Sequence, residues 1–286
     1  IHAEINKKGL LQRNNILGTA LVDMYAKCCE IVKAQEVFDE LLDKDVVAWT
    51  ALISGYAQLG MFKSVFASFN EMIENNVMPT GITFVILLTA CNHAGLVDDG
   101  EIYFNTMSNV YCIVPSLEHY TCMVDLFGRA GHFEKAMNLI DEVPLPNRLN
   151  LWMALMGGCR KWVNVEIGRW AFKCSIQLDA KHAPAYVSMN NIYAAAGMLE
   201  EAKEVEALRI QNGALEIPGC CMWIDGNGDA HSFSAGDKSH PQSQHIYAKL
   251  RDISRKIMNH SHLNWVSQVS LDDQTEILPC KHSEKL

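Results

Sequence analysis

Residues 51–56 read Ala-Leu-Ile-Ser-Gly-Tyr, and residues 20–25 read Ala-Leu-Val-Asp-Met-Tyr. Each stretch is followed by an alanine and then, three residues later, by a turn position: Gly60 in the one and Cys29 in the other. Further steps of 35, 36, 32 and 34 residues lead to four more turn positions, which are Gly95, Gly131, Val163 and Gly197. A period of roughly 34 residues, with glycine at most of the turns, is typical of a repeat architecture.

The residues after each turn repeat as well. Five residues after the turn, a small side chain occurs at Ala34, Gly100, Ala136, Gly168 and Ala202, with the larger Val65 as the exception. Four residues further on come Phe38, Phe69, Phe104, Ile140 and Phe172, and the last copy breaks the pattern with Glu206. This regular register predicts that successive units pack in the same way.

One unit can be followed from its residues to its structure. Its first apolar stripe has helical spacing and consists of Leu52, Ile53 and Tyr56. Gly60 ends that helix, because glycine enters a left-handed turn without a steric cost. A second stripe is made of Val65, Phe66, Phe69 and Met72, and Pro79 then ends the unit. One hairpin cannot bury both stripes, so we predict an all-α fold, a right-handed α-solenoid of stacked helix-turn-helix repeats.

The composition argues against several other classes of protein. The net charge of −9 and the pI near 5.6 disfavour a protein that holds nucleic acid mainly by its phosphates. The ten cysteines include no Cys-x-x-Cys, so paired-cysteine zinc is not expected, and most cysteines outside the two adjacent pairs are predicted to be small buried side chains. There is no apolar run of about 18 residues, so no membrane partner is expected. The chain begins at Ile1 without Met, and we expect a piece of a longer protein whose transit peptide lies elsewhere.

The repeat resembles the pentatricopeptide motif rather than the tetratricopeptide motif. Residues 49–60 resemble the first helix of a pentatricopeptide unit. Residues 72–79 resemble its Met-x-x-x-Gly-x-x-Pro ending, with Asn76 in place of the glycine. The uneven unit lengths resemble the plant subclass that alternates long, standard and short motifs. Cys29 and Val163 depart from the family pattern, because the turn glycine is absent at both.

The last third of the chain carries the most specific resemblance. Residues 218–224 read Pro-Gly-Cys-Cys-Met-Trp-Ile, and residues 236–241 read Gly-Asp-Lys-Ser-His-Pro. Both resemble the extension of plant organellar RNA-editing factors, where Cys221 stands in place of the usual serine, and a helix is expected over residues 242–257. Residues 282–286, His-Ser-Glu-Lys-Leu, resemble the opening of the DYW-type cytidine deaminase domain.

The resemblance divides the chain into five parts. Residues 1–14 are expected to be the tail of a preceding repeat, residues 15–148 four pentatricopeptide repeats, and residues 149–216 two degenerate extension repeats. Residues 217–262 are expected to form an E+-like extension, and residues 263–286 the truncated start of the deaminase domain. The six repeat units are placed at 15–45, 46–80, 81–116, 117–148, 149–182 and 183–216.

The resemblance also implies which side chains contact RNA. Helical repeats can read single-stranded RNA on the Watson–Crick edges of its bases, one base per repeat. The family assigns this role to the fifth and the last residue of each motif. The fifth residues are Thr19, Thr50, Val85 and Thr121, and the last residues are Asp45, Thr80, Ser116 and Asn147. By the family's code, the pair Thr19 and Asp45 prefers guanine, and the pair Thr121 and Asn147 prefers adenine.

The other two pairs give no clear base preference. Thr50 with Thr80 lies outside the code, and Val85 can neither donate nor accept a hydrogen bond. A threonine early in a helix can also be a cap or a space-filling residue, although three threonines at equivalent sites favour RNA reading. Trp162 and Trp170 are expected to pack between helices rather than to stack on a base. Reading base edges would let an acidic protein hold RNA, because less of the affinity then comes from phosphates.

The tail raises the question of catalysis. Zinc deaminases need a His-x-Glu, in which the histidine binds the metal and the glutamate moves protons, and a downstream Pro-Cys-x-x-Cys. His282 as metal ligand and Glu284 as catalytic residue match the first half, but the chain ends at Leu286. A single ligand does not hold zinc in a tetrahedral site. This chain is therefore expected to bind no cofactor and not to be an enzyme by itself, with zinc present only if the missing deaminase domain is present.

These observations lead to three hypotheses about function. The first is sequence-specific binding of single-stranded RNA in C-to-U editing, in a mitochondrion or chloroplast, with a DYW-type deaminase or other editing factors as protein partners. The second is a protein–protein scaffold like the tetratricopeptide arrays, which the net charge favours. The third is a fragment of a zinc-dependent cytidine deaminase. The first is preferred because of the family resemblance, together with Thr19, Thr50 and Thr121 at the sites that the resemblance makes equivalent.

Overall fold

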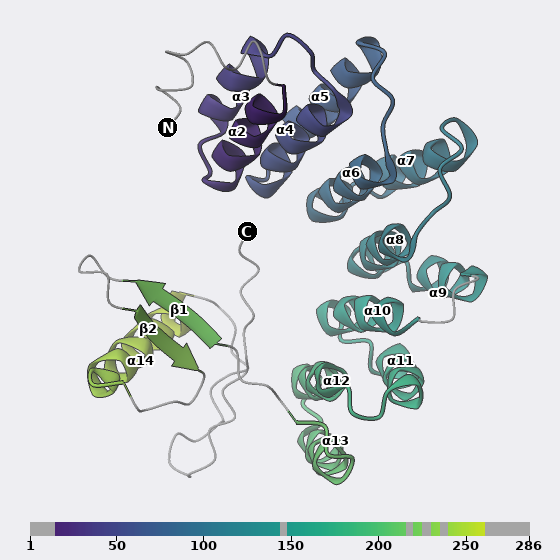
Figure 1. Ribbon diagram of the computed structural model, residues 1–286. Helices are drawn as coiled ribbons and strands as arrows, with labels where there is room; N and C mark the ends of the chain where they lie inside the picture. Colours follow the sequence, from purple (N-terminus) through teal and green to yellow (C-terminus); the bar gives the residue numbers. More distant parts are fainter. Residues whose placement is uncertain (1–14, 144–147, 216–219, 225–229, 235–239, 261–286) are drawn as a thin grey trace. The chain divides into compact units, whose positions relative to one another are not determined.

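The computed structural model describes residues 15–143, 148–215, 220–224, 230–234 and 240–260. Its contacts divide the chain into two units, one that ends at Asn212 and one that begins at Gly213. In its described part the first unit is a series of helical hairpins (Figure 1). Its helices are α2 (Asn15–Lys27), α3 (Ile31–Glu40), α4 (Val46–Gln58), α5 (Phe62–Glu74), α6 (Gly81–Ala94), α7 (Val97–Asn109), α8 (Leu117–Ala130), α9 (Phe133–Glu142), α10 (Leu149–Trp162), α11 (Val165–Leu178), α12 (Ala183–Ala195) and α13 (Leu199–Gln211).

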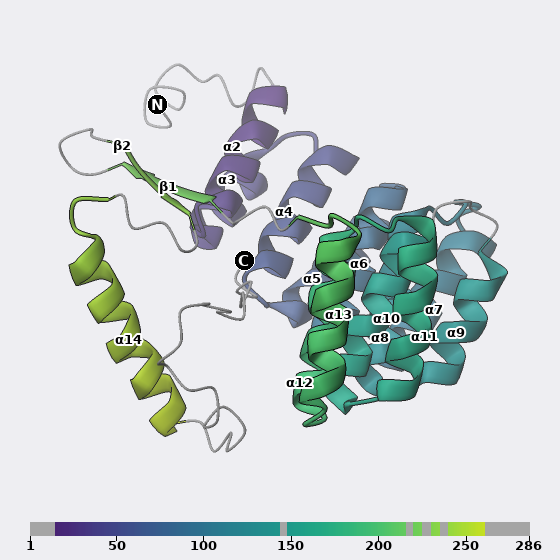
Figure 2. The same ribbon diagram turned by 90° about the horizontal axis from the view of Figure 1, so that it is seen from below.

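The even-numbered helices of the first unit form a continuous layer. Each packs against the next, from α2 on α4 to α10 on α12, and each odd-numbered helix packs against its even-numbered neighbours. Among the described helices, no two odd-numbered ones pack extensively together. Figure 1 shows α6, α8, α10 and α12 along the inner edge of this unit and α7, α9, α11 and α13 along its outer edge, and Figure 2 shows the helices side by side. The predicted α-solenoid is confirmed, and the first helix of each hairpin lies on the inner side.

The predicted turn positions all adopt the left-handed backbone conformation. The four glycines have positive φ angles, which are 69° at Gly60, 70° at Gly95, 83° at Gly131 and 74° at Gly197. Cys29 and Val163 adopt the same conformation, with φ of 60° and 53°, although both carry a side chain. Such a conformation costs a residue other than glycine about 1 kcal/mol. The packing of the hairpins therefore holds the turn even where glycine is missing.

The repeated aromatic residues join one hairpin to the next. A phenylalanine from an odd-numbered helix meets, edge to face, an aromatic ring at the fourth residue of the following even-numbered helix. The pairs and their centroid distances are Phe38 and Trp49 at 4.6 Å, Phe69 and Phe84 at 5.8 Å, Phe104 and Tyr120 at 5.5 Å, and Phe172 and Tyr186 at 5.3 Å. The register seen in the sequence is thus the register of contacts between hairpins.

Small residues bring some of the inner helices very close together. A Cβ atom built on Gly158 of α10 would lie 2.5 Å from the carbonyl carbon of Gly128 in α8. A Cβ atom on Gly55 of α4 would lie 2.7 Å from the Cβ of Ala26 in α2. Both distances are far below van der Waals contact, so these two junctions leave no room for a larger side chain.

The second unit contains a β-hairpin and a helix. The strands β1 (Cys220–Ile224) and β2 (Ala230–Ser234) pair antiparallel, with Cys221 opposite Phe233. The helix α14 (Ser243–His260) confirms the helix that we predicted over residues 242–257. The all-α prediction did not include the hairpin, because a short apolar run such as Cys-Cys-Met-Trp-Ile does not distinguish a strand from a buried helix.

Candidate RNA interface

The expected fifth residues occupy one position in successive inner helices. Thr19, Thr50, Val85 and Thr121 are the fifth residues of α2, α4, α6 and α8. The hydroxyl of Thr50 donates to the Val46 carbonyl oxygen at 2.6 Å, and that of Thr121 donates to the Leu117 carbonyl oxygen at 2.8 Å. These are ordinary bonds of a helical threonine to its own backbone, and they leave lone pairs of the hydroxyl oxygen as acceptors.

Thr19 differs from the other two threonines. It is only 8% exposed, and its Oγ1 has no hydrogen-bond partner among the described residues. A buried hydroxyl without a partner costs about 1–3 kcal/mol. A hydrogen bond from a bound molecule would remove that cost. Val85 is half-buried and offers no polar atom.

The expected last residues begin the inner helix of the next hairpin. Asp45 is the N-cap of α4, and its Oδ1 accepts two backbone N–H groups of that helix at 3.0 and 2.9 Å. Thr80 and Ser116 are the N-caps of α6 and α8. Asn147 lies outside the described residues. Capping accounts for one oxygen of Asp45 and leaves Oδ2 for other partners.

Each last residue is also linked to the inner helix of its own hairpin. Asn15, in the first turn of α2, donates through Nδ2 to Oδ2 of Asp45 at 3.1 Å. Thr83 lies between Thr50 and Thr80, and its Oγ1 is 3.4 Å and 3.3 Å from their hydroxyl oxygens. In the second unit this link joins the last residue, Thr80, to the fifth residue, Thr50. In the first unit it reaches the first turn of α2 at Asn15.

The third link passes through a buried histidine. Nδ1 of His119 accepts the backbone N–H of Ser116 at 3.0 Å, so its Nε2 carries the proton and donates to the Gly81 carbonyl oxygen at 2.8 Å. Gly81 is the first residue of α6, and His119 is only 3% exposed. The Ser116 hydroxyl donates to Glu118 at 2.6 Å, and this bond lowers the pKa of the Glu118 carboxyl. The donor of Ser116 is thus already used within the protein.

Sequence reasoning missed the three linking residues. Thr83 and His119 each lie three residues after an N-cap, which is the spacing of the capping box, so this signal was available. Asn15 has no such signal, because its contact with Asp45 depends on how two hairpins stack.

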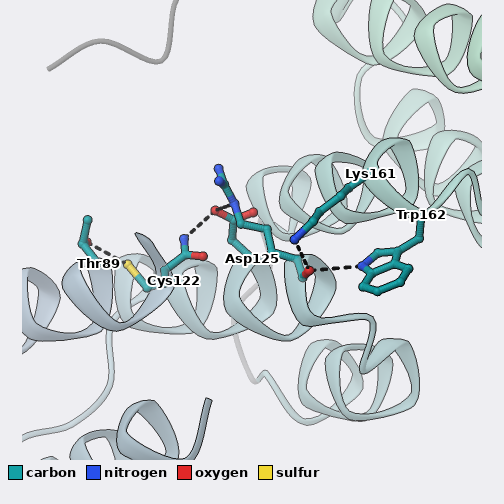
Figure 3. Close-up of polar contacts among 7 residues, drawn as sticks. Thr89, Cys122, Asp125, Lys161 and Trp162 are labelled. Carbon is teal, nitrogen blue, oxygen red and sulfur yellow. Dashed lines mark hydrogen bonds and ion pairs between the residues drawn. The ribbon is translucent and has the colours of Figure 1, made fainter. Parts of the chain in front are cut away.

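A second set of polar contacts lies nearer the C-terminal ends of the inner helices (Figure 3). Asn92 of α6 donates to Asp125 of α8 at 2.6 Å, and Asp125 also accepts from Nε of Arg129 at 3.0 Å. Lys161 and Trp162 of α10 both donate to the carbonyl oxygen of Arg129, at 2.9 Å and 3.1 Å. These contacts join three successive inner helices.

The two tryptophans that were expected to pack have different environments. Trp170 meets Trp152 edge to face, with the ring centroids 4.7 Å apart. Trp162 lies against Gly131, whose Cβ, if present, would be 3.1 Å from the indole, but 53% of Trp162 remains exposed. The packing prediction therefore accounts for Trp170 better than for Trp162.

The cysteines follow the sequence prediction only in part. Cys91 and Cys159 are buried, and burial raises the pKa of both thiols to about 12. Cys122 is half-buried beside the hydroxyl of Thr89, and burial raises its pKa as well. Cys112 is an exception to the prediction for most cysteines, because it is exposed in the loop after α7.

The described residues contain no group of three or more His, Cys, Asp or Glu side chains that could hold a metal ion. His282 and Glu284, the expected metal ligand and catalytic residue, lie outside these residues. Within the same parts of the chain, every helix is too short or too polar to cross a membrane.

Comparison with known families accounts for most of the chain. The PPR repeat matches residues 19–46 and 118–144, the PPR repeat family 44–93, the E motif 162–225 and the E+ motif 230–257. The chain belongs to the pentatricopeptide repeat proteins. Its E and E+ motifs are those of the plant subclass that alternates motif lengths, as the sequence predicted.

Relatives of this pentatricopeptide repeat protein occur in Arabidopsis thaliana. Pentatricopeptide repeat-containing protein At5g66520 is 39% identical over 290 residues, which cover 100% of this chain and 46% of the relative. A relative named mitochondrial, At3g26782, is 36% identical and 44% covered, and one named chloroplastic, DOT4, is 36% identical and 33% covered, each over the whole of this chain. The chain thus spans less than half the length of these relatives.

Solved structures show the same fold. The crystal structure of the pentatricopeptide repeat protein PPR10 from maize matches 70% of this chain and 30% of its own, with a TM-score of 0.57 at 21% identity. PPR10 in complex with an 18-nt psaJ RNA element matches 74% of this chain and 32% of its own, with a TM-score of 0.57 at 19% identity. The solenoid described above is therefore the architecture of this family.

Proposed function

We propose that this pentatricopeptide repeat chain binds single-stranded RNA by reading base edges, as the recognition part of a C-to-U RNA-editing factor. The observation that supports this most is the arrangement of the fifth and last residues. In three successive hairpins each last residue is tied, directly or through one side chain, to the inner helix of its own unit. In the second unit Thr83 joins two polar positions, Thr50 and Thr80, and such a pair matches a code of one base per repeat.

The proposal also assigns a role to each part of the chain. We assign residues 15–148 to four base-reading repeats and 149–216 to two extension repeats that read no base edge. Residues 217–262 would form the E+ extension, with the start of a deaminase domain from 263 and the tail of an earlier repeat at 1–14. The fifth residues of α10 and α12, Met153 and Val187, are poor partners for a base edge, a property that Val85 shares in the third repeat.

The editing step and the compartment rest on the comparisons. E and E+ motifs follow the repeats, and a deaminase of the DYW type would be supplied by the longer protein or by a partner. PPR10, which shares the fold, has been crystallised with an RNA element. Relatives are named mitochondrial or chloroplastic, so we place this chain in one of these organelles.

The chain by itself is proposed to catalyse nothing and to hold no cofactor. His282 and Glu284 provide one metal ligand and one acid–base group, which is half of what a zinc deaminase needs. The test is metal analysis of the purified chain. Stoichiometric zinc would overturn the assignment and favour an active deaminase.

The proposal is tested by titrating RNA oligonucleotides into the chain. Two test RNAs each carry one guanine, for Thr19 with Asp45, and one adenine three nucleotides away, for Thr121 with Asn147. In one RNA the guanine lies 5′ of the adenine, and in the other it lies 3′. One order should bind about tenfold more tightly than a scrambled RNA of the same composition. Equal binding of all three RNAs would contradict the assignment of guanine and adenine to these two residue pairs.

A single substitution sharpens this test. Asp45→Asn converts the pair Thr19 and Asp45 into the pair carried by Thr121 and Asn147, so the preference of the first unit should change from guanine to adenine. The reason is that a carboxylate only accepts hydrogen bonds and suits the N–H groups of guanine, whereas an amide also donates, to N1 of adenine. Asparagine caps a helix as well as aspartate does, so α4 should keep its stability. An unchanged preference for guanine would contradict the assignment of Asp45.

The alternative function is a protein–protein scaffold, which the net charge of −9 favours. A scaffold would retain a protein partner and no RNA in a pull-down, and its binding would change little with salt. RNA binding would weaken as salt rises, because counterions compete for phosphate contacts.

A further inference from the structure

The last turns of several inner helices carry a basic residue at the thirteenth position. In α2 this residue is Lys27 and in α8 it is Arg129. One turn earlier these helices carry Asp23 and Asp125, whose carboxylates lie 2.6 Å and 3.0 Å from the two cations. The positive charge is therefore balanced within the same helix.

The equivalent turn of α10 has no such carboxylate. Gly157 lies one turn before Lys161, and Arg160 adds a second cation. Among the described residues no carboxylate pairs with either cation, and Lys161 donates instead to the carbonyl oxygen of Arg129. The nearest acid along the chain, Glu166, lies in the first turn of α11. Two exposed positive charges thus remain unbalanced at the end of α10.

The charge of the surrounding hairpin differs from that of the chain. Residues 149–182 contain five Lys and Arg and two Asp and Glu, a formal charge of +3, whereas the whole chain carries −9. The field near this hairpin therefore favours an anion, while most of the protein repels one.

An aromatic side chain lies beside these two cations. The indole N–H of Trp162 donates to the Arg129 carbonyl oxygen at 3.1 Å, and the ring rests against Gly131. Nζ of Lys161 is 5.7 Å from the ring centroid. These contacts fix the ring in one place, yet 53% of Trp162 remains exposed. An anchored and exposed indole next to a cation is a suitable platform for a nucleotide base.

We propose that Arg160, Lys161 and Trp162, which we name the α10 basic end, bind one nucleotide of single-stranded RNA beyond those read by the four repeats. The two cations contact its phosphate, and the indole stacks on its base without regard to sequence. A nucleotide fits better than an acidic peptide because it combines an anion with a flat ring. The inference rests on the proposed RNA binding and adds a contact in the first extension repeat.

The test uses two RNAs of equal length and charge. Both carry the guanine and adenine core in the order that binds, with about four uridines added either next to the adenine or next to the guanine. The adenine belongs to the fourth repeat, which precedes α10, so only the tail beside the adenine passes α10. Replacing both cations, Arg160→Gln with Lys161→Gln, should weaken the adenine-tailed RNA about tenfold and reduce its salt slope by about 0.7, because one phosphate contact is lost. The guanine-tailed RNA should change less than about twofold.

A matched control removes two cations from the outer helices, Lys33→Gln in α3 and Lys135→Gln in α9, and should affect both RNAs equally and weakly. A second variant, Trp162→Leu, should weaken only the adenine-tailed RNA, about fivefold or more. Equal losses on both RNAs, or losses no larger than in the control, would overturn the proposed RNA contact at the α10 basic end. If the unaltered chain prefers neither core order over scrambled RNA, the proposed function itself fails.

Discussion

The junction between α8 and α10 and the junction between α6 and α8 join equivalent helices by opposite means. At the first, Gly128 and Gly158 bring two backbones together without room for a Cβ atom. At the second, the buried Asn92 occupies the position equivalent to Gly128 and donates to Asp125 at 2.6 Å. The first junction combines close backbone contact with the bonds of Lys161 and Trp162 to Arg129, whereas the second is made at the same position by a buried side-chain hydrogen bond. The inner layer of the solenoid therefore does not need one kind of contact throughout.

The largest loss of stability is expected at the junction between α8 and α10, where the two backbones are in close contact. Gly158→Ala places a Cβ atom against the backbone of Gly128, so the helices must separate, and we expect a loss of about 2 kcal/mol and roughly 5 °C in Tm. The neighbouring Gly157→Ala is the control, because the nearest atom to its Cβ is 3.9 Å away. There the gain in helix propensity should raise stability by about 0.5–1 kcal/mol. If both substitutions stabilise the chain in thermal unfolding, the close contact is not real.

A smaller loss of stability is expected at the junction between α6 and α8, where Asn92 donates to Asp125. Asp125→Ala leaves the buried amide of Asn92 without its acceptor, and we expect a loss of about 1–2 kcal/mol in denaturant unfolding. The control is Asp23→Ala in α2, which breaks a more exposed ion pair with Lys27 and should cost less than about 0.5 kcal/mol. Equal losses at the two positions would show that Asn92 contributes nothing to the junction.

The smallest change in stability is expected at the turns that follow α8 and α10. The C-cap of α8 is Gly131 and that of α10 is Val163, and both residues have positive φ. Val163→Gly removes the strain of a branched side chain in that conformation and should raise stability by about 0.5–1 kcal/mol. Gly131→Ala should lower it, because the added Cβ atom would also approach Trp162 at 3.1 Å. Calorimetry of both variants measures the difference, and a destabilised Val163→Gly would mean that the side chain stabilises the turn.

The fold could be predicted because its decisive signals are periodic. The turn positions and the phenylalanines recur at fixed spacings, because the same turn conformation and the same ring contact recur along the array. The strands β1 and β2 could not be predicted in the same way, because a hairpin that occurs once leaves no period to detect.

The candidate site was accessible from the sequence only through resemblance. Thr50 and Thr121 look like ordinary helical threonines, and their bonds to their own backbone agree with that interpretation. Their neighbours in space, Thr80 and the linking Thr83, are fixed by the stacking of one hairpin on the next. Local sequence carries no information on that stacking beyond its period.

The aromatic pairs have a consequence for how such a chain can grow. The hairpins α4–α5 and α6–α7 each carry a ring on the first helix and another on the second, and both rings meet partners in neighbouring hairpins. A duplicate of such a hairpin therefore carries a ring for either neighbour, and its insertion beside the original preserves these pairs. Length can change by whole units during evolution without redesign of any interface, which makes this protein extendable in the manner of a modular polymer.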